Sequence, residues 1–147
     1  MDKPPPDRKA PTRTHNTWTR HYQIVWENRA HDYSLPLWLR LACIAYARHE
    51  ANGHANFKRG QLSWILGTPP KGDQPFKRVD RWTLSNALAL AIRREWIADG
   101  SCTECLVVPG HAIEGPDGDA TKPCTVHVRK QLGKKRVQLR VVPDAGA

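Results

Sequence analysis

Two short pairs of potential metal ligands constrain the fold of this chain more than any other feature of its sequence. Cys102 and Cys105 have two residues between them, and so do Cys124 and His127. Each pair can place two ligands on one ion, and the eighteen residues between Cys105 and Cys124 suit zinc ribbons and related sites. The sequence therefore predicts a closed, tetrahedral Cys3His site for one structural Zn²⁺ per chain, which would tie residues 102–130 together.

Other interpretations of these residues stay open from the sequence. His111 is a rival fourth ligand without the pair spacing, and the four cysteines could also be unrelated thiols or form disulfides. The opening segment, MDKPPPDRKAPTRTHN, lacks the apolar stretch of a secretory signal. No apolar run approaches the roughly 18–20 residues of a membrane helix. We therefore expect a cytoplasmic protein without membrane contact, and in a reducing compartment clustered cysteines more often bind metal.

The charge of the chain favours a polyanionic partner. Lys and Arg total 23 against 14 Asp and Glu, a formal net charge of +9, and the pI is about 9.8. Such a balance is typical of proteins that bind nucleic acid. No acidic residue occurs over 120–143, and the basic residues within 129–140 form a candidate phosphate-facing strip. Its members include Arg129, Lys130, Lys134, Lys135 and Arg136. A solvated charged face is the alternative interpretation of this strip.

Apolar patterning and turn residues give an order of elements along the chain. Residues 34–53 are apolar on nearly every side, which predicts a buried central helix that begins near Ser34 and Pro36 and ends at Gly53. Residues 1–16 are polar and rich in Pro, so we expect a flexible basic arm, and 143–147 form a short tail. The other predicted elements are helices over 57–67 and from about 80 to 99, a loop over 68–79, and strands over 105–108, 125–129 and 137–142.

Two segments carry a resemblance to a known family. ANGHANFKRGQLSWILG and RVDRWTLSNALALAIRREWIADG resemble the second helix and the recognition helix of winged helix-turn-helix proteins. Related patterns occur in transcription regulators of the GntR type and in phage and plasmid replication or regulatory proteins. The resemblance implies an α+β domain over residues 17–142, with a three-helix core and a small antiparallel sheet, the wing, which the zinc site would staple. A long, Pro-rich turn and a Cys-bearing insertion in the wing depart from the family pattern.

The predicted third helix has a face suited to reading DNA. A recognition helix presents short polar groups and Arg to base edges from its N-terminal half, while its other face packs on the core. Leu84 and Ala87 lie on the predicted packing face. The candidate base-reading residues are Arg81, Thr83, Ser85 and Asn86, and Lys77 and Arg78 are candidate phosphate contacts. Asp80, Thr83 or Ser85 could instead cap the helix. Among the tryptophans, Trp38, Trp64 and Trp96 are expected in the core, and Trp82 is expected to be exposed.

The function expected from these features is sequence-specific binding of double-stranded DNA by a small, nucleoid-associated transcriptional regulator. A homodimer is possible, and no small-molecule ligand is expected. A replication or recombination accessory protein and a protein-interaction adaptor are the alternatives. An enzyme is not expected. His49 and His54 are five residues apart, whereas the metalloprotease motif needs a spacing of four on one helix. Asp117 and Asp119 do not match a calcium loop.

Overall fold

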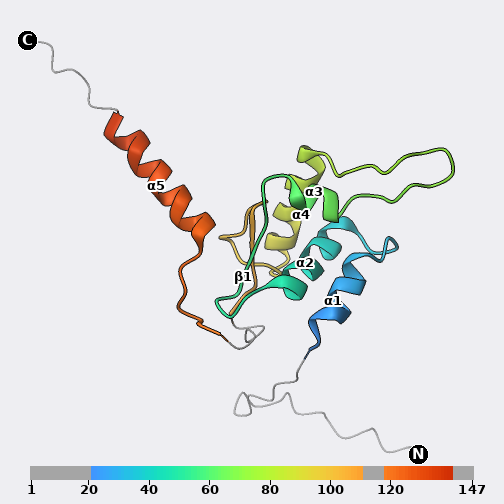
Figure 1. Ribbon diagram of the computed structural model, residues 1–147, viewed down its shortest axis with the longest axis horizontal. Coiled ribbons are helices and arrows are strands. Elements are labelled where there is room, and N and C mark those ends of the chain that lie inside the picture. Colours follow the sequence, from blue (N-terminus) through green and yellow to red (C-terminus); the bar gives the residue numbers. More distant parts are fainter. Residues whose placement is uncertain (1–20, 111–117, 141–147) are drawn as a thin grey trace, which may run out of the picture.

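The computed structural model describes residues 21–110 and 118–140, the last five of them by their backbone alone. Within these ranges the chain is a mixed α+β structure with five helices and one two-stranded antiparallel sheet. The predicted arm over 1–16, the tail over 143–147 and His111 lie outside the described residues. The elements in chain order (Figure 1) are α1 (Gln23–Ala30), α2 (Leu37–Arg48), β1 (His54–Asn56), α3 (Gln61–Ile65), α4 (Arg81–Arg93), β2 (Cys105–Val107) and α5 (Thr125–Arg140).

Helix α2 forms the centre of the core, as its apolar sequence predicts. Every residue from Arg40 to Ala47 is buried, and α1 and α4 both pack against this helix. The expected end at Gly53 is wrong, because α2 already ends at Arg48. After that residue a tight turn brings the N–H of Glu50 to the carbonyl of His54, 3.0 Å away, and Gly53 supplies the positive φ of +77° that this turn requires. The chain thereby enters β1.

A buried arginine fastens three helices together. Arg40 on α2 is 5% exposed, and its Nε donates a hydrogen bond to the carbonyl of Ala30 at the end of α1, over 2.7 Å. Its Nη2 donates to the carbonyl of Leu66 at the end of α3, over 3.2 Å. Carbonyls at helix ends have no partner within their own helix, so these bonds satisfy groups that burial would otherwise leave unpaired.

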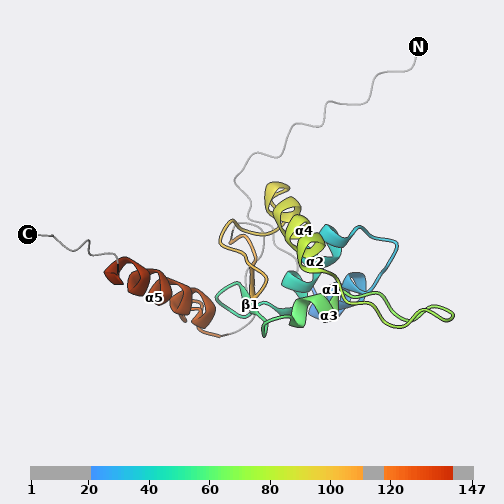
Figure 2. The ribbon, with the colours of Figure 1, turned by 90° about the horizontal axis from the view of Figure 1, so that it is seen from above.

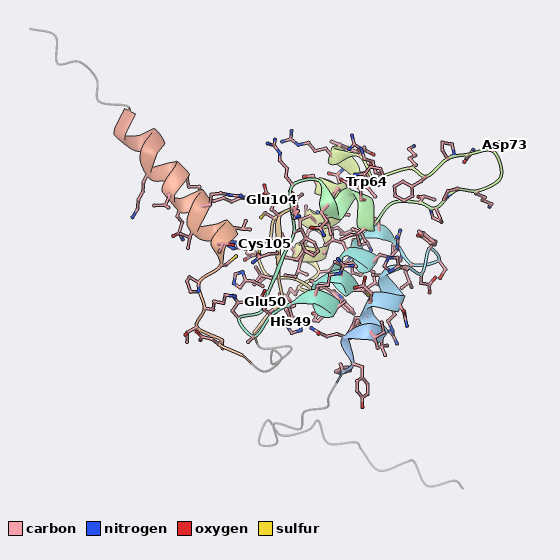
Figure 3. The ribbon with its side chains drawn as sticks, in the orientation of Figure 1. His49, Glu50, Trp64, Asp73, Glu104 and Cys105 are labelled. Carbon is pink, nitrogen blue, oxygen red and sulfur yellow. The ribbon has the colours of Figure 1, made fainter. Side chains whose placement is uncertain are left out.

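A long connection separates α3 from α4. Thr68 and Lys77 exchange backbone hydrogen bonds of 2.8 and 3.0 Å, so residues 68–77 run out and back as a narrow ribbon. Figure 3 places Asp73 at its far tip. Trp64 stacks on Phe76 at the base of the ribbon, with ring centroids 5.0 Å apart, and is 57% exposed. The expected core position of Trp64 is therefore wrong: it lies on the outer side of α3, whose inner side is formed by buried residues such as Leu62.

The sheet has two chemically different faces. His54 pairs with Val107, Ala55 with Leu106, and Asn56 with Cys105. Because successive side chains of a strand point to opposite faces, the fully buried Ala55 and Leu106 enter the main core. The other face carries His54 and Asn56 from β1 with Cys105 and Val107 from β2.

The strands predicted over 125–129 and 137–142 are wrong as far as the described residues reach, because this part of the chain forms α5. The alternation in TVHVR spans five residues. The basic segment that follows is made mostly of Arg, Lys, Gln and Leu, which are good helix formers. Figures 1 and 2 show α5 projecting away from the body formed by α1–α4. Within the described residues, none of the helices has the length and apolar character needed to cross a membrane.

Candidate functional site

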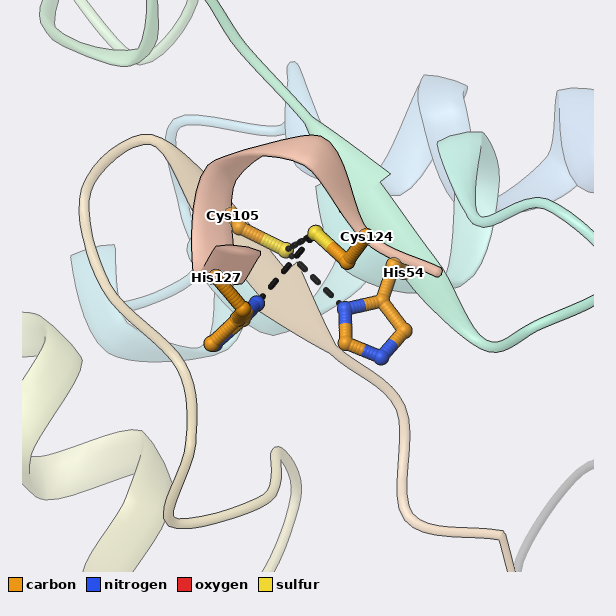
Figure 4. A group of neighbouring side chains, drawn as sticks. All are labelled: His54, Cys105, Cys124 and His127. Atoms are coloured by element: carbon orange, nitrogen blue, oxygen red, sulfur yellow. Dashed lines mark hydrogen bonds between the residues drawn. The ribbon is translucent and has the colours of Figure 1, made fainter. Parts of the chain in front are cut away.

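Four side chains from three parts of the chain converge on one point beside the sheet. His54 comes from β1 and Cys105 from β2, while Cys124 precedes α5 and His127 lies in its first turn. Figure 4 shows the two sulfur atoms and the two imidazole rings turned toward a common centre. One ligand atom from each residue can be chosen so that all four lie within 4.8 Å of one another, and this His2Cys2 cluster could hold a metal ion.

Three of the separations between these atoms are close to those of a tetrahedral site. Zn–S bonds of about 2.3 Å and Zn–N bonds of about 2.0–2.1 Å place neighbouring ligand atoms roughly 3.3–3.8 Å apart. The two sulfur atoms of Cys105 and Cys124 are 3.6 Å apart. The Nδ1 atom of His54 lies 3.3 Å from the Cys105 sulfur, and that of His127 lies 3.2 Å from the Cys124 sulfur. These three separations are close to those of a tetrahedral site, and all four ligand atoms lie within 4.8 Å of one another.

Groups behind the cluster orient its members. The Nε2 atom of His127 lies 2.7 Å from the carbonyl oxygen of Gly100 and can donate its hydrogen there. With Nε2 turned to this carbonyl, Nδ1 is the ring nitrogen that faces the Cys124 thiol, 3.2 Å away, which is the arrangement of most metal-binding histidines. On the other side the Cys124 thiol donates to Oδ1 of Asn56, over 3.3 Å. Asn56 thus contacts the cluster from the same face of β1 as His54.

The four side chains also shift one another's pKa. Burial, followed by the hydrogen bond with Cys124, raises the pKa of the Cys105 thiol. Burial acts in the same direction on Cys124, but hydrogen bonds, chiefly those with His127, outweigh it and lower the pKa of Cys124 to about 7. The hydrogen bond with Cys124 raises the pKa of His127, whereas burial and then the charge of His127 lower that of His54. Cys124 is thus a thiol that releases its proton readily when a metal ion binds.

Three of the four ligands predicted from sequence, Cys105, Cys124 and His127, belong to this cluster, and the fourth member is His54. Cys102 is half-buried and packs beside Cys105, with which it exchanges two backbone hydrogen bonds of 2.7 and 3.0 Å, but it is not part of the group of four. In the sequence, the spacing of His54 from His49 fails the metalloprotease motif, so His54 is not among the predicted ligands. Its role depends on the pairing of β1 with β2, about fifty residues apart in sequence, which no local spacing reveals.

Helix α4 separates a buried face from an exposed polar face, as predicted. Leu84, Ala87 and Ala91 are buried, whereas Arg81, Ser85 and Asn86 are exposed. Asp80 caps the helix, accepting hydrogen bonds from the N–H of Thr83 at 2.9 Å and from its hydroxyl at 2.6 Å. Thr83 is half-buried and its hydroxyl is engaged in the cap, so the structure separates it from the exposed residues with which it was grouped. Trp82 lies on the outer side and is 75% exposed.

The surroundings of α4 are strongly basic. Between residues 57 and 94 the chain has eight Lys and Arg residues and two Asp residues, a net charge of +6. All eight are exposed: Lys58, Arg59, Lys71, Lys77, Arg78, Arg81, Arg93 and Arg94. Lys58 and Arg59 lie just before α3, separated from it by Gly60, and they are not among the candidate DNA contacts predicted from the sequence, although two adjacent basic residues are a visible signal.

The basic strip predicted over 129–136 lies on α5 rather than on a strand. Its described side chains, those of Arg129, Lys130, Lys134 and Lys135, are exposed, and the side chain of Arg136 lies outside the described residues. Arg129 forms an ion pair with Glu104, and Figure 3 shows Glu104 next to Cys105. The structure therefore keeps the strip accessible but places it beyond the metal cluster, on the far side from α1 (Figure 1).

Comparisons with protein-family models, curated proteins and solved structures found no match to this chain.

Proposed function

We propose that this protein binds double-stranded DNA sequence-specifically, as a small transcriptional regulator, and that a structural Zn²⁺ joins His54, Cys105, Cys124 and His127. The observation that carries the DNA-binding proposal is the exposed face of α4. Arg81 and Asn86 can each make two hydrogen bonds to one base, Arg to guanine and Asn to adenine, and both side chains are free of the core. The opposite face of the same helix is packed, so α4 can be held rigidly against a groove.

The order of elements supports this assignment. The central helix α2, the short helix α3, the connection over 68–77, helix α4 and strand β2 follow one another as the resemblance to winged helix-turn-helix proteins predicts, with strand β1 added between α2 and α3. The third of these helices reads the major groove in such domains. The ribbon over 68–77 replaces the short turn of that family, and Lys77 and Arg78 leave it directly before α4. Both side chains are exposed, and we expect them to contact phosphates beside a groove that α4 enters.

Zinc is the metal that suits this ligand set. A set of two thiolates and two imidazoles is typical of Zn²⁺, whereas Mg²⁺ and Ca²⁺ prefer oxygen ligands. Bound there, the ion would supply a cross-link between the sheet and the start of α5. We assign no catalytic step to it, because four protein ligands leave a tetrahedral ion without an open position.

The test is selection from a random duplex library by the zinc-loaded full chain, followed by affinity measurements on the selected sequence. Arg81→Ala and Asn86→Ala should each weaken binding to that sequence by roughly 1–3 kcal/mol and relax the preference at one base pair. Arg29→Ala is the matched control, because it removes an exposed Arg from α1. No selected sequence, or equal binding by the α4 variants and the parent protein, would refute the proposal.

A protein-docking role is the second candidate, and the exposure of Trp82 on the same face of α4 favours it. Large exposed aromatic residues are typical of protein interfaces. Salt dependence separates the two roles, because the logarithm of a DNA affinity falls with the logarithm of salt concentration in proportion to the phosphates contacted. A partner bound with little change between about 50 and 200 mM salt would favour docking of a protein on Trp82.

A further inference from the structure

As far as its side chains are described, helix α5 has few contacts with the body of the protein beyond its first turn. Val126 is buried and His127 half-buried, but every described side chain from Val128 to Lys135 is exposed. Within the described residues, the ion pair between Arg129 and Glu104 is the last polar contact that α5 makes with the body. Packing against the core therefore does not account for the remaining turns of this helix.

The sequence of α5 does not account for them either. The helix has six Lys and Arg residues and no acidic residue, a net charge of +6. Lys130 and Lys134 are four residues apart, so their like charges lie on one side of the helix and oppose its formation. Gly133 lies near the middle, where it disfavours helix. A helix of 16 residues with these features is marginal in water without a partner.

The start of α5, by contrast, is fixed at two points. The N–H of Val128 donates to the carbonyl of Cys124 over 3.0 Å, closing the first turn. Cys124 and His127, three residues apart, are both in the metal cluster. An ion bound by both residues would hold this turn closed. The first turn is the costly step of helix formation, and each later residue adds one hydrogen bond. The metal cluster is thus located where it can nucleate α5.

From these observations we infer that α5 is a DNA-binding arm. The metal ion nucleates its helix, and contact with the phosphate backbone of duplex DNA stabilises the remaining turns. This inference rests on the proposed DNA binding and on metal binding by the cluster. Charge complementarity identifies the partner, because a strip without acidic residues gains most from a polyanion. At about 1.5 Å per residue α5 is about 24 Å long, which spans roughly seven base pairs. Phosphates beside Lys130 and Lys134 would attract both ammonium groups and screen the repulsion between them.

Two substitutions of Gly133 test the inference without touching a metal ligand or α4. A Cβ added at Gly133 meets no atom within 4 Å, so alanine fits there. If α5 folds as it binds, Gly133→Ala makes the helix easier to form and tightens DNA binding by up to about fivefold. Gly133→Pro should interrupt the helix and weaken binding by about tenfold or more at low salt, because the distal basic residues lose their alignment with the phosphates.

Circular dichroism supplies the second readout. Helical signal should rise when duplex is added to the zinc-loaded parent protein, and it should rise less in Gly133→Pro. Both variants should keep the zinc affinity of the parent, since Gly133 is six residues beyond the last ligand. Zinc removal should lower the helical signal of the DNA-free protein, because α5 then lacks its nucleus.

Three results would overturn the inference. If Arg81→Ala weakens DNA binding but both Gly133 variants bind DNA as tightly as the parent protein, the proposed function stands and α5 takes no part in DNA binding. A helical signal unchanged by DNA would show that α5 is complete without a polyanion. A helical signal that rises with protein concentration in the absence of DNA would show that a second copy, docked on Val128 and Leu132, completes the helix instead. Failure of the parent protein to bind any duplex would refute the proposed function itself.

Discussion

Replacing His54 with alanine tests which residues hold the metal. The spacing of the sequence favours Cys102 as the fourth ligand, whereas the structure places His54 in the cluster. Alanine at position 54 removes one imidazole from the group and leaves the pairing of β1 with β2 intact, because that pairing uses backbone atoms. Cys102→Ser is the matched variant, since it removes the rival ligand and keeps a side chain of similar size.

The expected effect of His54→Ala is large. Structural Zn²⁺ sites have apparent binding free energies of about 10–16 kcal/mol. An equal share for each of four ligands is roughly 2.5–4 kcal/mol, so losing His54 should weaken zinc binding about 10²- to 10³-fold. Cys102→Ser should change the affinity by less than about threefold, because the Cys102 side chain packs beside the cluster without belonging to it.

Competition with a chromophoric chelator measures both affinities, and Co²⁺ in place of Zn²⁺ reports the ligands directly. Charge-transfer absorption from thiolate to Co²⁺ grows with the number of sulfur ligands, so the parent protein and Cys102→Ser should give the same two-thiolate spectrum. Cys105→Ser should lose part of it. The reasoning is refuted if Cys102→Ser lowers affinity and absorption while His54→Ala changes neither, because the ligands would then be the Cys3His set.

Three further outcomes follow from contacts in the fold. Arg40→Met should lower the free energy of unfolding by about 3 kcal/mol, since it removes two buried hydrogen bonds from a charged donor to helix-end carbonyls. Chemical denaturation measures this change, and a decrease of less than about 1 kcal/mol would contradict the role given to Arg40. Gly67→Ala should lower the free energy of unfolding by about 1–3 kcal/mol, because the added Cβ would lie 2.3 Å from the Phe76 ring and 2.9 Å from the carbonyl oxygen of Lys77 at the base of the ribbon. An unchanged melting temperature would show that the ribbon shifts freely to make room. Zinc at 100 times its Kd should stabilise the chelated protein by about 2.7 kcal/mol, and a melting temperature indifferent to zinc would argue against the centre.

Local patterns were sufficient to predict the helices that pack on the core. The apolar run around Leu41 and Ile44 indicated a buried helix, and the spacing of Leu84, Ala87 and Ala91 indicated which face of α4 packs; both predictions are confirmed. These features repeat within a few residues, so they are visible in the chain before it folds. The exposed face of α4 follows from the same periodicity.

Long-range pairing could not be predicted in the same way. Strand β1 has three residues, too few for a recognisable pattern, and its partner lies about fifty residues away. His54 was therefore missed as a member of the metal cluster. Helix α5 was missed for a different reason: the alternation of TVHVR favours a strand, while the hydrogen bond from Val128 to Cys124 closes a helical turn there. A short alternation does not decide between these outcomes.

The two faces of the small sheet have a consequence for how the chain finds its fold. With three residues in each strand, backbone hydrogen bonds alone discriminate weakly between neighbouring alignments. A slip of one residue would turn His54 into the apolar core and Ala55 toward Cys124, so that no metal ion could bind. An ion held by His54 and Cys105 would therefore select the correct strand register, because it binds only chains in which β1 and β2 are paired as in this structure.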